Sequence, residues 1–109
     1  MKSKYIKTST TNDLEFVGYI ETSCETVAEF VEDIVRDEGH YQFSFIMTAN
    51  AFGTKIPVNV AVLIIRNRNV INDRGFEDIK HQSIESIKYR DGWGGVELTV
   101  KLKNNFATL

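Results

Sequence analysis

The side chains best suited to select a partner are acidic and lie in one stretch of the sequence. Residues 21 to 38 carry seven acidic side chains and one basic one, a local charge of -6 in a chain whose formal total is -2. If this stretch is helical, four of the acids share the face opposite its apolar stripe, because successive residues advance by about 100°: Glu25, Glu29, Glu32 and Asp33. A charged helix face is often merely solvated. Our hypothesis is that this one docks on a protein with a basic surface.

Trp93 is a second candidate contact, in the glycine-rich segment 91–95 between two apolar runs. Aromatic side chains dominate binding hot spots, so an exposed Trp93 would anchor a partner. The alternative is a tryptophan folded over the end of a sheet, because tryptophan is usually mostly buried. We include Trp93 with the four acids as a predicted partner-binding residue.

The sequence gives little support to catalysis or metal binding. Cys24 is the only cysteine and lies on an apolar stripe, which is typical of a buried structural thiol. His40 and His81 belong to no zinc-binding pattern, and no phosphate-binding glycine motif is present. We therefore expect no catalytic residue, no metal, no cofactor and no enzymatic activity.

A small-ligand or enzymatic domain, in that case dimeric, is the first alternative. It would use the few polar side chains of the expected strands, which are Tyr41, Gln42, Ser44 and Asn59.

A weak nucleic-acid binder is the second alternative. It would use the basic residues of the C-terminal half, which are Arg66, Arg68, Arg74, Lys88 and Arg90. Residues 66–103 hold eight basic and six acidic side chains, a surplus too small to steer a polyanion. The charge balance therefore argues against nucleic acid as a partner.

The length indicates a single domain, and the distribution of apolar residues indicates no membrane-spanning helix. A chain of 109 residues builds one hydrophobic core. No apolar run approaches the roughly 20 residues that a membrane helix needs, and residues 1–13 lack the apolar core of a signal peptide. A single cysteine favours a reducing compartment. We expect a cytoplasmic protein with a flexible polar tail over residues 1–13 and one α+β domain over 14–109.

Apolar residues at helical spacing predict one long amphipathic helix over about residues 23–38. Thr22 and Glu25 have the spacing of a capping box at its start.

Alternating apolar and polar residues predict strands over 14–20, 41–48, 56–65 and 96–103. Residues 50–54 are expected to form a hairpin loop and residues 67–75 a series of turns. The apolar run 60–65 indicates a central strand, covered on both sides. At a sheet edge that run would need a second copy to cover it, so a homodimer is compatible with the sequence.

Residues 76–90 fit two structures. A strand over 84–90 would form a hairpin with the last strand, whereas a helix over 76–89 would give the ferredoxin-like order βαββαβ. We favour the strand. The expected fold is therefore α+β: an antiparallel sheet of four or five strands with the long helix packed on it.

The expected function follows from the acidic face and the absence of catalytic motifs. We expect a non-enzymatic protein-binding or accessory module, of the immunity, inhibitor or adaptor type found in bacteria and phages. It would present its acidic helix to a partner protein.

Overall fold

Seven strands in one sheet make up most of the described chain. The computed structural model describes residues 2–12, 15–37, 39–92 and 94–106. The strands lie in the order β1-β2-β6-β7-β3-β4-β5. The elements are β1 (Ser3–Asn12), β2 (Glu15–Thr22), α1 (Val27–Val35), β3 (His40–Ala51), β4 (Thr54–Arg66), β5 (Asn69–Arg74), α2 (Phe76–Ile79), β6 (Ile84–Gly92) and β7 (Gly95–Phe106).

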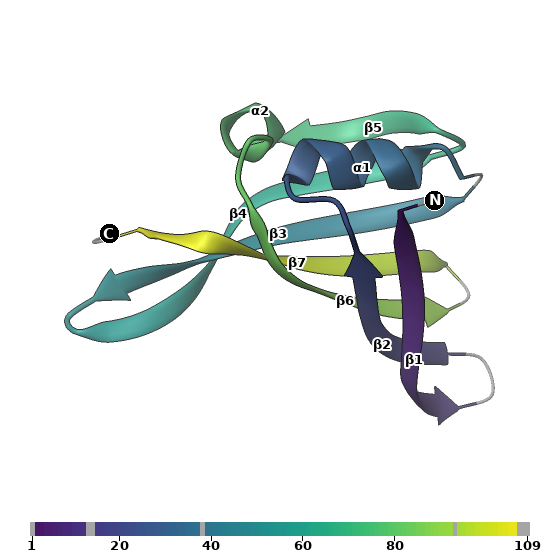
Figure 1. The fold of residues 1–109 in the computed structure, drawn as a ribbon, viewed down its shortest axis with the longest axis horizontal. Helices are drawn as coiled ribbons and strands as arrows, with labels where there is room; N and C mark the ends of the chain where they lie inside the picture. The colour runs from purple at the N-terminus through teal and green to yellow at the C-terminus, as the bar shows by residue number, and fades with distance from the viewer. Residues whose placement is uncertain (1, 13–14, 38, 93, 107–109) are drawn as a thin grey trace.

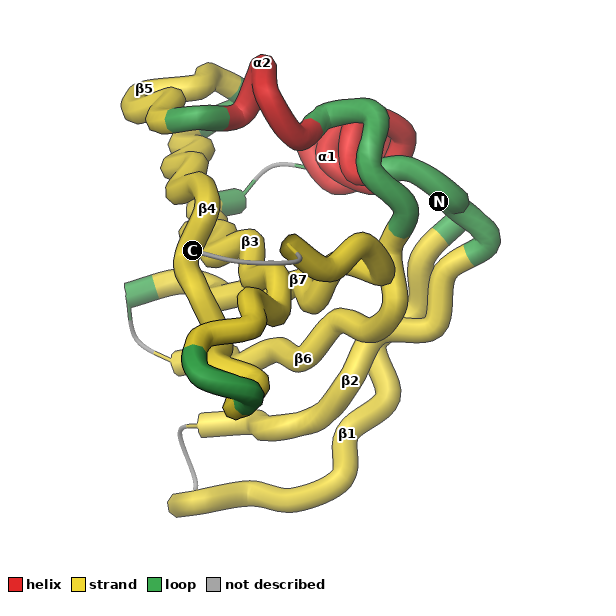
Figure 2. Tube along the Cα trace, turned by 90° about the vertical axis from the view of Figure 1, so that its left-hand side faces the viewer, coloured by secondary structure: helices red, strands yellow, loops and turns green. Residues whose placement is uncertain are grey.

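The sheet curves around helix α1. Strands β3 and β7 pair in parallel at its centre, and the other neighbouring strands pair antiparallel. Figure 1 shows α1 lying in front of the sheet, and the side view in Figure 2 shows the strands bending round beneath it. One face of the sheet therefore packs on α1, and neither helix of the described residues covers the opposite face.

This architecture corrects the fold class expected from the sequence. The prediction of four or five antiparallel strands with a long helix over 23–38 is wrong, because the sheet has seven strands and α1 spans nine residues. The ferredoxin-like alternative is also wrong. Only Phe76–Ile79 is helical in its expected second helix, and β6 takes up the rest from residue 84 on.

Helix α1 starts later than its apolar spacing predicts, because the preceding residues pair with another segment. Thr26 forms a β-bridge with Ser83, and the first helical N–H groups donate to carbonyls of the loop after α2. The Thr26 hydroxyl accepts a hydrogen bond from the Glu29 backbone N–H at 3.3 Å. The N-cap is therefore Thr26 rather than Thr22, and it contributes about 1 kcal/mol to helix stability.

The core lies between α1 and the concave face of the sheet. Phe30 of α1 meets Phe43 of β3 edge-on at 5.9 Å between ring centroids, and Phe43 stacks on Phe45 at 5.8 Å. All three rings are fully buried. Burying each ring contributes about 1.5–3 kcal/mol to stability. The burial of these residues confirms that the apolar stripe of α1 and the alternating apolar residues of β3 form the core.

The N-terminal segment forms an edge strand where the sequence predicted a flexible tail. Residues Ser3 to Asn12 pair with β2 along their length. Few of them are apolar, so the segment lacks the pattern of a buried strand. Lysines such as Lys4 and Lys7 suit an outer edge, because charged side chains discourage pairing with another chain.

The remaining strand predictions are confirmed, with one correction around residues 67–75. Strands β2, β3, β4, β6 and β7 cover the expected segments. In the stretch expected to form only turns, Asn67 and Arg68 make one turn and residues 69–74 form β5. Strand β5 pairs with the second half of β4, which places that apolar run inside the sheet and removes the reason for a second copy to cover it.

The β3–β4 hairpin extends past its neighbours. Within the described residues, β7 pairs with β3 as far as Ala49, and β5 pairs with β4 from Val62 on. Residues 50–55 pair only within the β3–β4 hairpin, and Ile56 pairs with Ala49. We call residues 50–56 the hairpin arm. Figure 1 shows the arm projecting from the sheet at the lower left.

Candidate functional site

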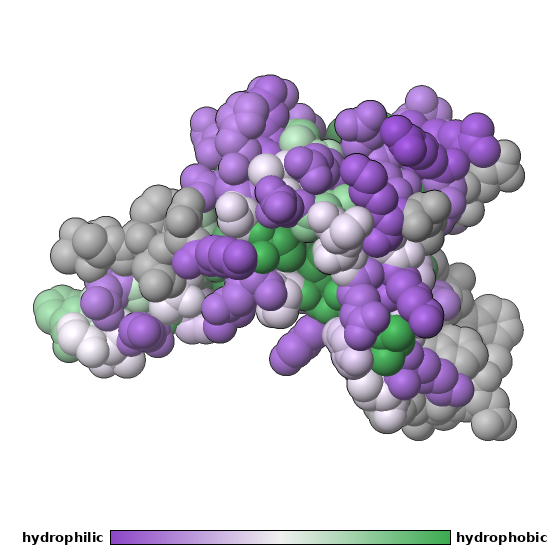
Figure 3. All heavy atoms as spheres, in the orientation of Figure 1, coloured by the Kyte–Doolittle hydropathy of each residue, from purple (hydrophilic) through white to green (hydrophobic). Residues whose placement is uncertain are grey.

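The tip of the hairpin arm carries a phenylalanine that is fully exposed. Phe52 has a relative exposure of 107%, the highest of the exposed large apolar side chains described. Ile56 on the same arm is 41% exposed. Figure 3 shows that the free end of the arm, at the left of the view, is apolar.

The backbone at Phe52 is unfavourable for its residue type. Its φ is 52° and that of Gly53 is 79°, so both central residues of the turn are left-handed, as in a type I′ hairpin turn. The first of these positions favours Asn, Asp or Gly, and the left-handed region raises the free energy of other residues by about 1–2 kcal/mol.

A second turn in the same chain follows the preference at its first central position only. The β4–β5 turn has φ values of 51° and 65° at Asn67 and Arg68, with asparagine first and arginine where glycine is usual. Neither turn geometry nor packing therefore accounts for Phe52. Strain held at an exposed side chain points to a role outside the fold.

Sequence reasoning predicted the loop over residues 50–54 but did not single out Phe52. The available signal was the dipeptide Phe-Gly where a two-residue hairpin normally carries Asn-Gly. The length of the arm, which decides whether the tip is free, depends on where β5 and β7 stop pairing.

The acidic residues do not form the continuous face that the sequence predicted. A Glu29 carboxylate oxygen accepts a hydrogen bond from the Glu25 backbone N–H at 3.2 Å, and Glu32 forms an ion pair with Arg36 at 3.5 Å. Glu25, Glu29 and Glu32 are exposed, but Glu25 precedes the helix. Two of these acids thus have local partners that explain them as parts of α1.

Asp33 departs furthest from the expected surface position. It is only 4% exposed, and its Oδ1 accepts a hydrogen bond from the Lys2 backbone N–H at 3.0 Å. Burial raises the pKa of its carboxyl, but the hydrogen bonds from Lys2 and Ser3, together with nearby positive charge such as that of Arg36, hold the pKa below its usual value. Asp33 therefore ties the start of β1 to α1 and presents no charge to a partner.

Of the two other residues considered from the sequence, Trp93 and Cys24, the structure describes only Cys24. Trp93 lies outside the described residues, although the β6–β7 hairpin around it forms as expected, with Gly92 opposite Gly95. Cys24 is buried, as expected of a structural thiol. Across the described ranges, no group of three or more His, Cys, Asp or Glu side chains could hold a metal ion.

An apolar groove of about 540 Å³ lies between α1 and the segment around α2. Val31, Val35 and Phe76 form its apolar walls, and Arg68 stands at its rim.

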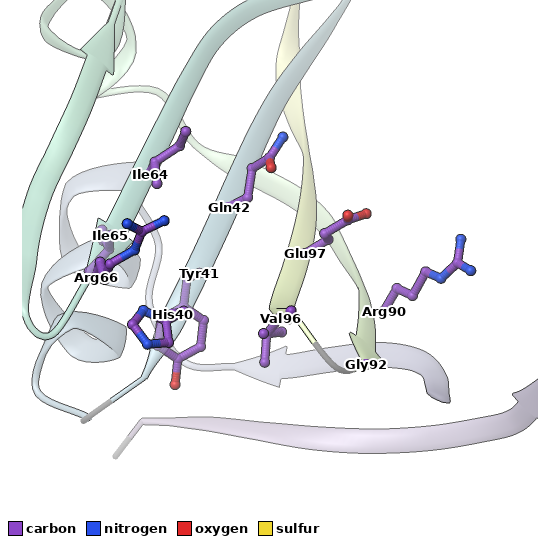
Figure 4. Close-up of a pocket in the computed structure, with 12 residues that line it drawn as sticks. His40, Tyr41, Gln42, Ile64, Ile65, Arg66, Arg90, Gly92, Val96 and Glu97 are labelled. Atoms are coloured by element: carbon purple, nitrogen blue, oxygen red, sulfur yellow. The ribbon is translucent and has the colours of Figure 1, made fainter. Parts of the chain in front are cut away.

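A more polar cavity of about 520 Å³ lies at one end of the sheet, where β3 begins, β4 ends and the β6–β7 hairpin turns. Figure 4 shows its lining side chains, which include His40, Gln42, Arg66 and Glu97. The Tyr41 hydroxyl faces the same end, and burial raises its pKa, with the carboxylates of Asp37 and Asp91 adding to the effect. Tyr41 therefore stays protonated at neutral pH and cannot act as a base.

Four of the five basic residues considered for nucleic acid are exposed on one face of the sheet, the face that His40 and Gln42 share: Arg66, Arg74, Lys88 and Arg90. Arg68 lies in the β4–β5 turn and lines the apolar groove.

The chain has no significant match among known family models, curated proteins or solved structures. None of the helices in the described part of the chain is long and apolar enough to cross a membrane.

Proposed function

We propose that this protein is a non-enzymatic accessory module that engages a partner protein through its hairpin arm, with Phe52 as the anchor. One observation carries the proposal: a fully exposed aromatic side chain held in a strained turn at the end of a projecting hairpin. Burial of that ring in a partner would recover about 1.5–3 kcal/mol. This gain is comparable to the strain that the free protein tolerates at the same residue.

The side chains of the arm indicate the kind of partner surface that it would bind. The ring requires an apolar pocket, and Lys55, which is exposed further along the arm, requires an acidic or neutral rim. A partner of this kind suits a protein of immunity, inhibitor or adaptor type, and the single buried cysteine favours a cytoplasmic setting. Contacts by the exposed acids, Glu25, Glu29 and Glu32, stay a separate prediction.

The test is comparative affinity capture from the source organism with the wild-type chain and with Phe52→Asn. Asparagine fits the turn better than phenylalanine, so this variant keeps the arm folded while removing the ring. We expect at least one protein to be captured by the wild type and lost from the variant. Ile71→Asn is the matched control, because Ile71 is 55% exposed on β5, away from the arm.

The outcomes separate the two predicted surfaces. Loss of the partner with Phe52→Asn and its retention with Ile71→Asn support the proposal. Equal capture by the wild type and Phe52→Asn contradicts it, and loss with Glu29→Gln/Glu32→Gln alone would assign binding to the acids instead. If light scattering shows a wild-type dimer that Phe52→Asn dissociates, the partner of the arm is a second copy.

A further inference from the structure

We propose that the polar cavity at the end of the sheet binds a small organic anion, with Arg66 as its main ligand-binding residue. The cavity involves strands β3, β4, β6 and β7, and the hairpin arm contributes none of its lining residues. This site is therefore independent of the proposed protein-binding role.

The positive wall of the cavity is built by strand pairing. His40 at the start of β3 lies directly opposite Arg66 at the end of β4. Figure 4 shows their side chains next to each other. Gln42 lies two residues further along β3 on the same face, and its amide adds a donor. A guanidinium fork flanked by an imidazole and an amide is suited to a phosphate or carboxylate group, because arginine binds such oxyanions with two parallel hydrogen bonds.

The opposite wall carries a negative charge, so a ligand would bind in one orientation. Glu97 is the only acidic side chain among the described lining residues, and it pairs across the strands with Arg90. Arg90 extends away from Arg66 in Figure 4. Strand β3 separates the strands of Arg66 and Glu97, so their backbones lie about 10 Å apart. A ligand with an acidic group at one end and a hydroxyl or amine at the other matches this arrangement.

The residues that alternate with the polar lining face the core. Tyr41, Ile65 and Val96 lie on the other side of the strands from His40, Arg66 and Glu97, and Ile65 is fully buried. A ligand at the positive wall therefore meets the exposed polar side chains and the backbone at this end of the sheet. The size and polarity of the cavity together favour a phosphorylated or carboxylated metabolite over a bare inorganic ion.

The test is a titration of the isotope-labelled protein followed by NMR. The probes are glycerol 3-phosphate, succinate and inorganic phosphate, each compared with sodium chloride at the same ionic strength. We expect saturable shifts of the backbone amides at residues 40–42, 66 and 94–97 with at least one organic probe. The responses to glycerol 3-phosphate and succinate distinguish a phosphate ligand from a carboxylate ligand.

Two arginine variants show whether the site is specific. Arg66→Gln should weaken binding at least about tenfold, as expected when a bidentate charged contact is lost. Arg74→Gln removes the same charge from β5 outside the cavity and should leave binding within about twofold.

Saturable binding that Arg66→Gln alone weakens supports the site. The proposal is overturned if no organic probe saturates below about 10 mM, or if both arginine variants weaken binding equally, which would indicate general charge attraction. Phe52→Asn should bind the probes like the wild type, so a failure here is distinguishable from a failure of the hairpin arm.

Discussion

Phe52 and Asp33 are placed against the usual preferences of their residue types. Phe52 holds an apolar ring in water, whereas Asp33 holds a carboxylate in the core and stabilises it with the Lys2 N–H group. The sequence around Asp33 predicts an exposed position on a helix. Its burial could not be predicted locally, because the segment that covers it, the start of β1, comes from a distant part of the chain. Its burial thus serves the fold, whereas we propose that the exposed Phe52 serves an interaction outside it.

Phe52→Asn should stabilise the protein. Asparagine relieves the left-handed strain at the turn and loses no packing, because the ring is fully exposed. We expect the free energy of unfolding to rise by about 0.5–1 kcal/mol in urea denaturation. A lower free energy of unfolding would show that the ring supports the fold, and the strain argument would then be wrong.

Asp33→Asn should destabilise the protein in a pH-dependent way. The folded-state pKa of Asp33 is lowered, so the charged carboxylate stabilises the fold above its unfolded pKa of about 3.9. This stabilisation is lost as the pH falls through the folded pKa. We expect a deficit of about 1–2 kcal/mol at pH 7 that shrinks below about pH 4. A deficit independent of pH would contradict the role of the charge.

At the scale of elements, residue alternation predicts the interior strands well and the edges poorly. Strands β3 and β7 bury alternate side chains, so their pattern is plain in the sequence. The edge strands β1 and β5 are rich in Thr, Lys and Asn, because an edge strand meets more water and less core. The helix prediction was too long, because a bridge to the loop after α2 occupies its expected first turn.

Gly18→Ala tests whether β1 belongs to the cooperative fold. A Cβ at Gly18 would overlap the Ile6 carbonyl of β1 and approach the Tyr89 ring to 2.9 Å. We expect the free energy of unfolding to fall by about 1–3 kcal/mol and the amides of β1 to lose hydrogen-exchange protection. Gly94→Ala is the control, because a Cβ there meets nothing within 4 Å. Unchanged protection of β1 in Gly18→Ala would contradict this packing.

At the scale of the molecule, the fold decides which charged side chains are exposed and which lie close together. Residues 21–38 carry a local charge of -6, and two of these acids have partners in the fold: Glu32 pairs with Arg36, and Asp33 accepts a hydrogen bond from Lys2 of the N-terminal segment. The polar cavity gathers side chains from four strands that are distant in the sequence, so residue spacing could not reveal it. The free length of the hairpin arm likewise depends on where its neighbouring strands end.

The most direct test of the hairpin arm is the dissociation constant of the captured partner, measured with the wild type and with Phe52→Asn. The variant should be at least as stable as the wild type, so a change in affinity reports the lost ring rather than a lost fold. We predict that Phe52→Asn raises the dissociation constant at least about tenfold, as expected for a hot-spot side chain. A dissociation constant within about twofold of the wild type would contradict the assignment of Phe52 as the anchor.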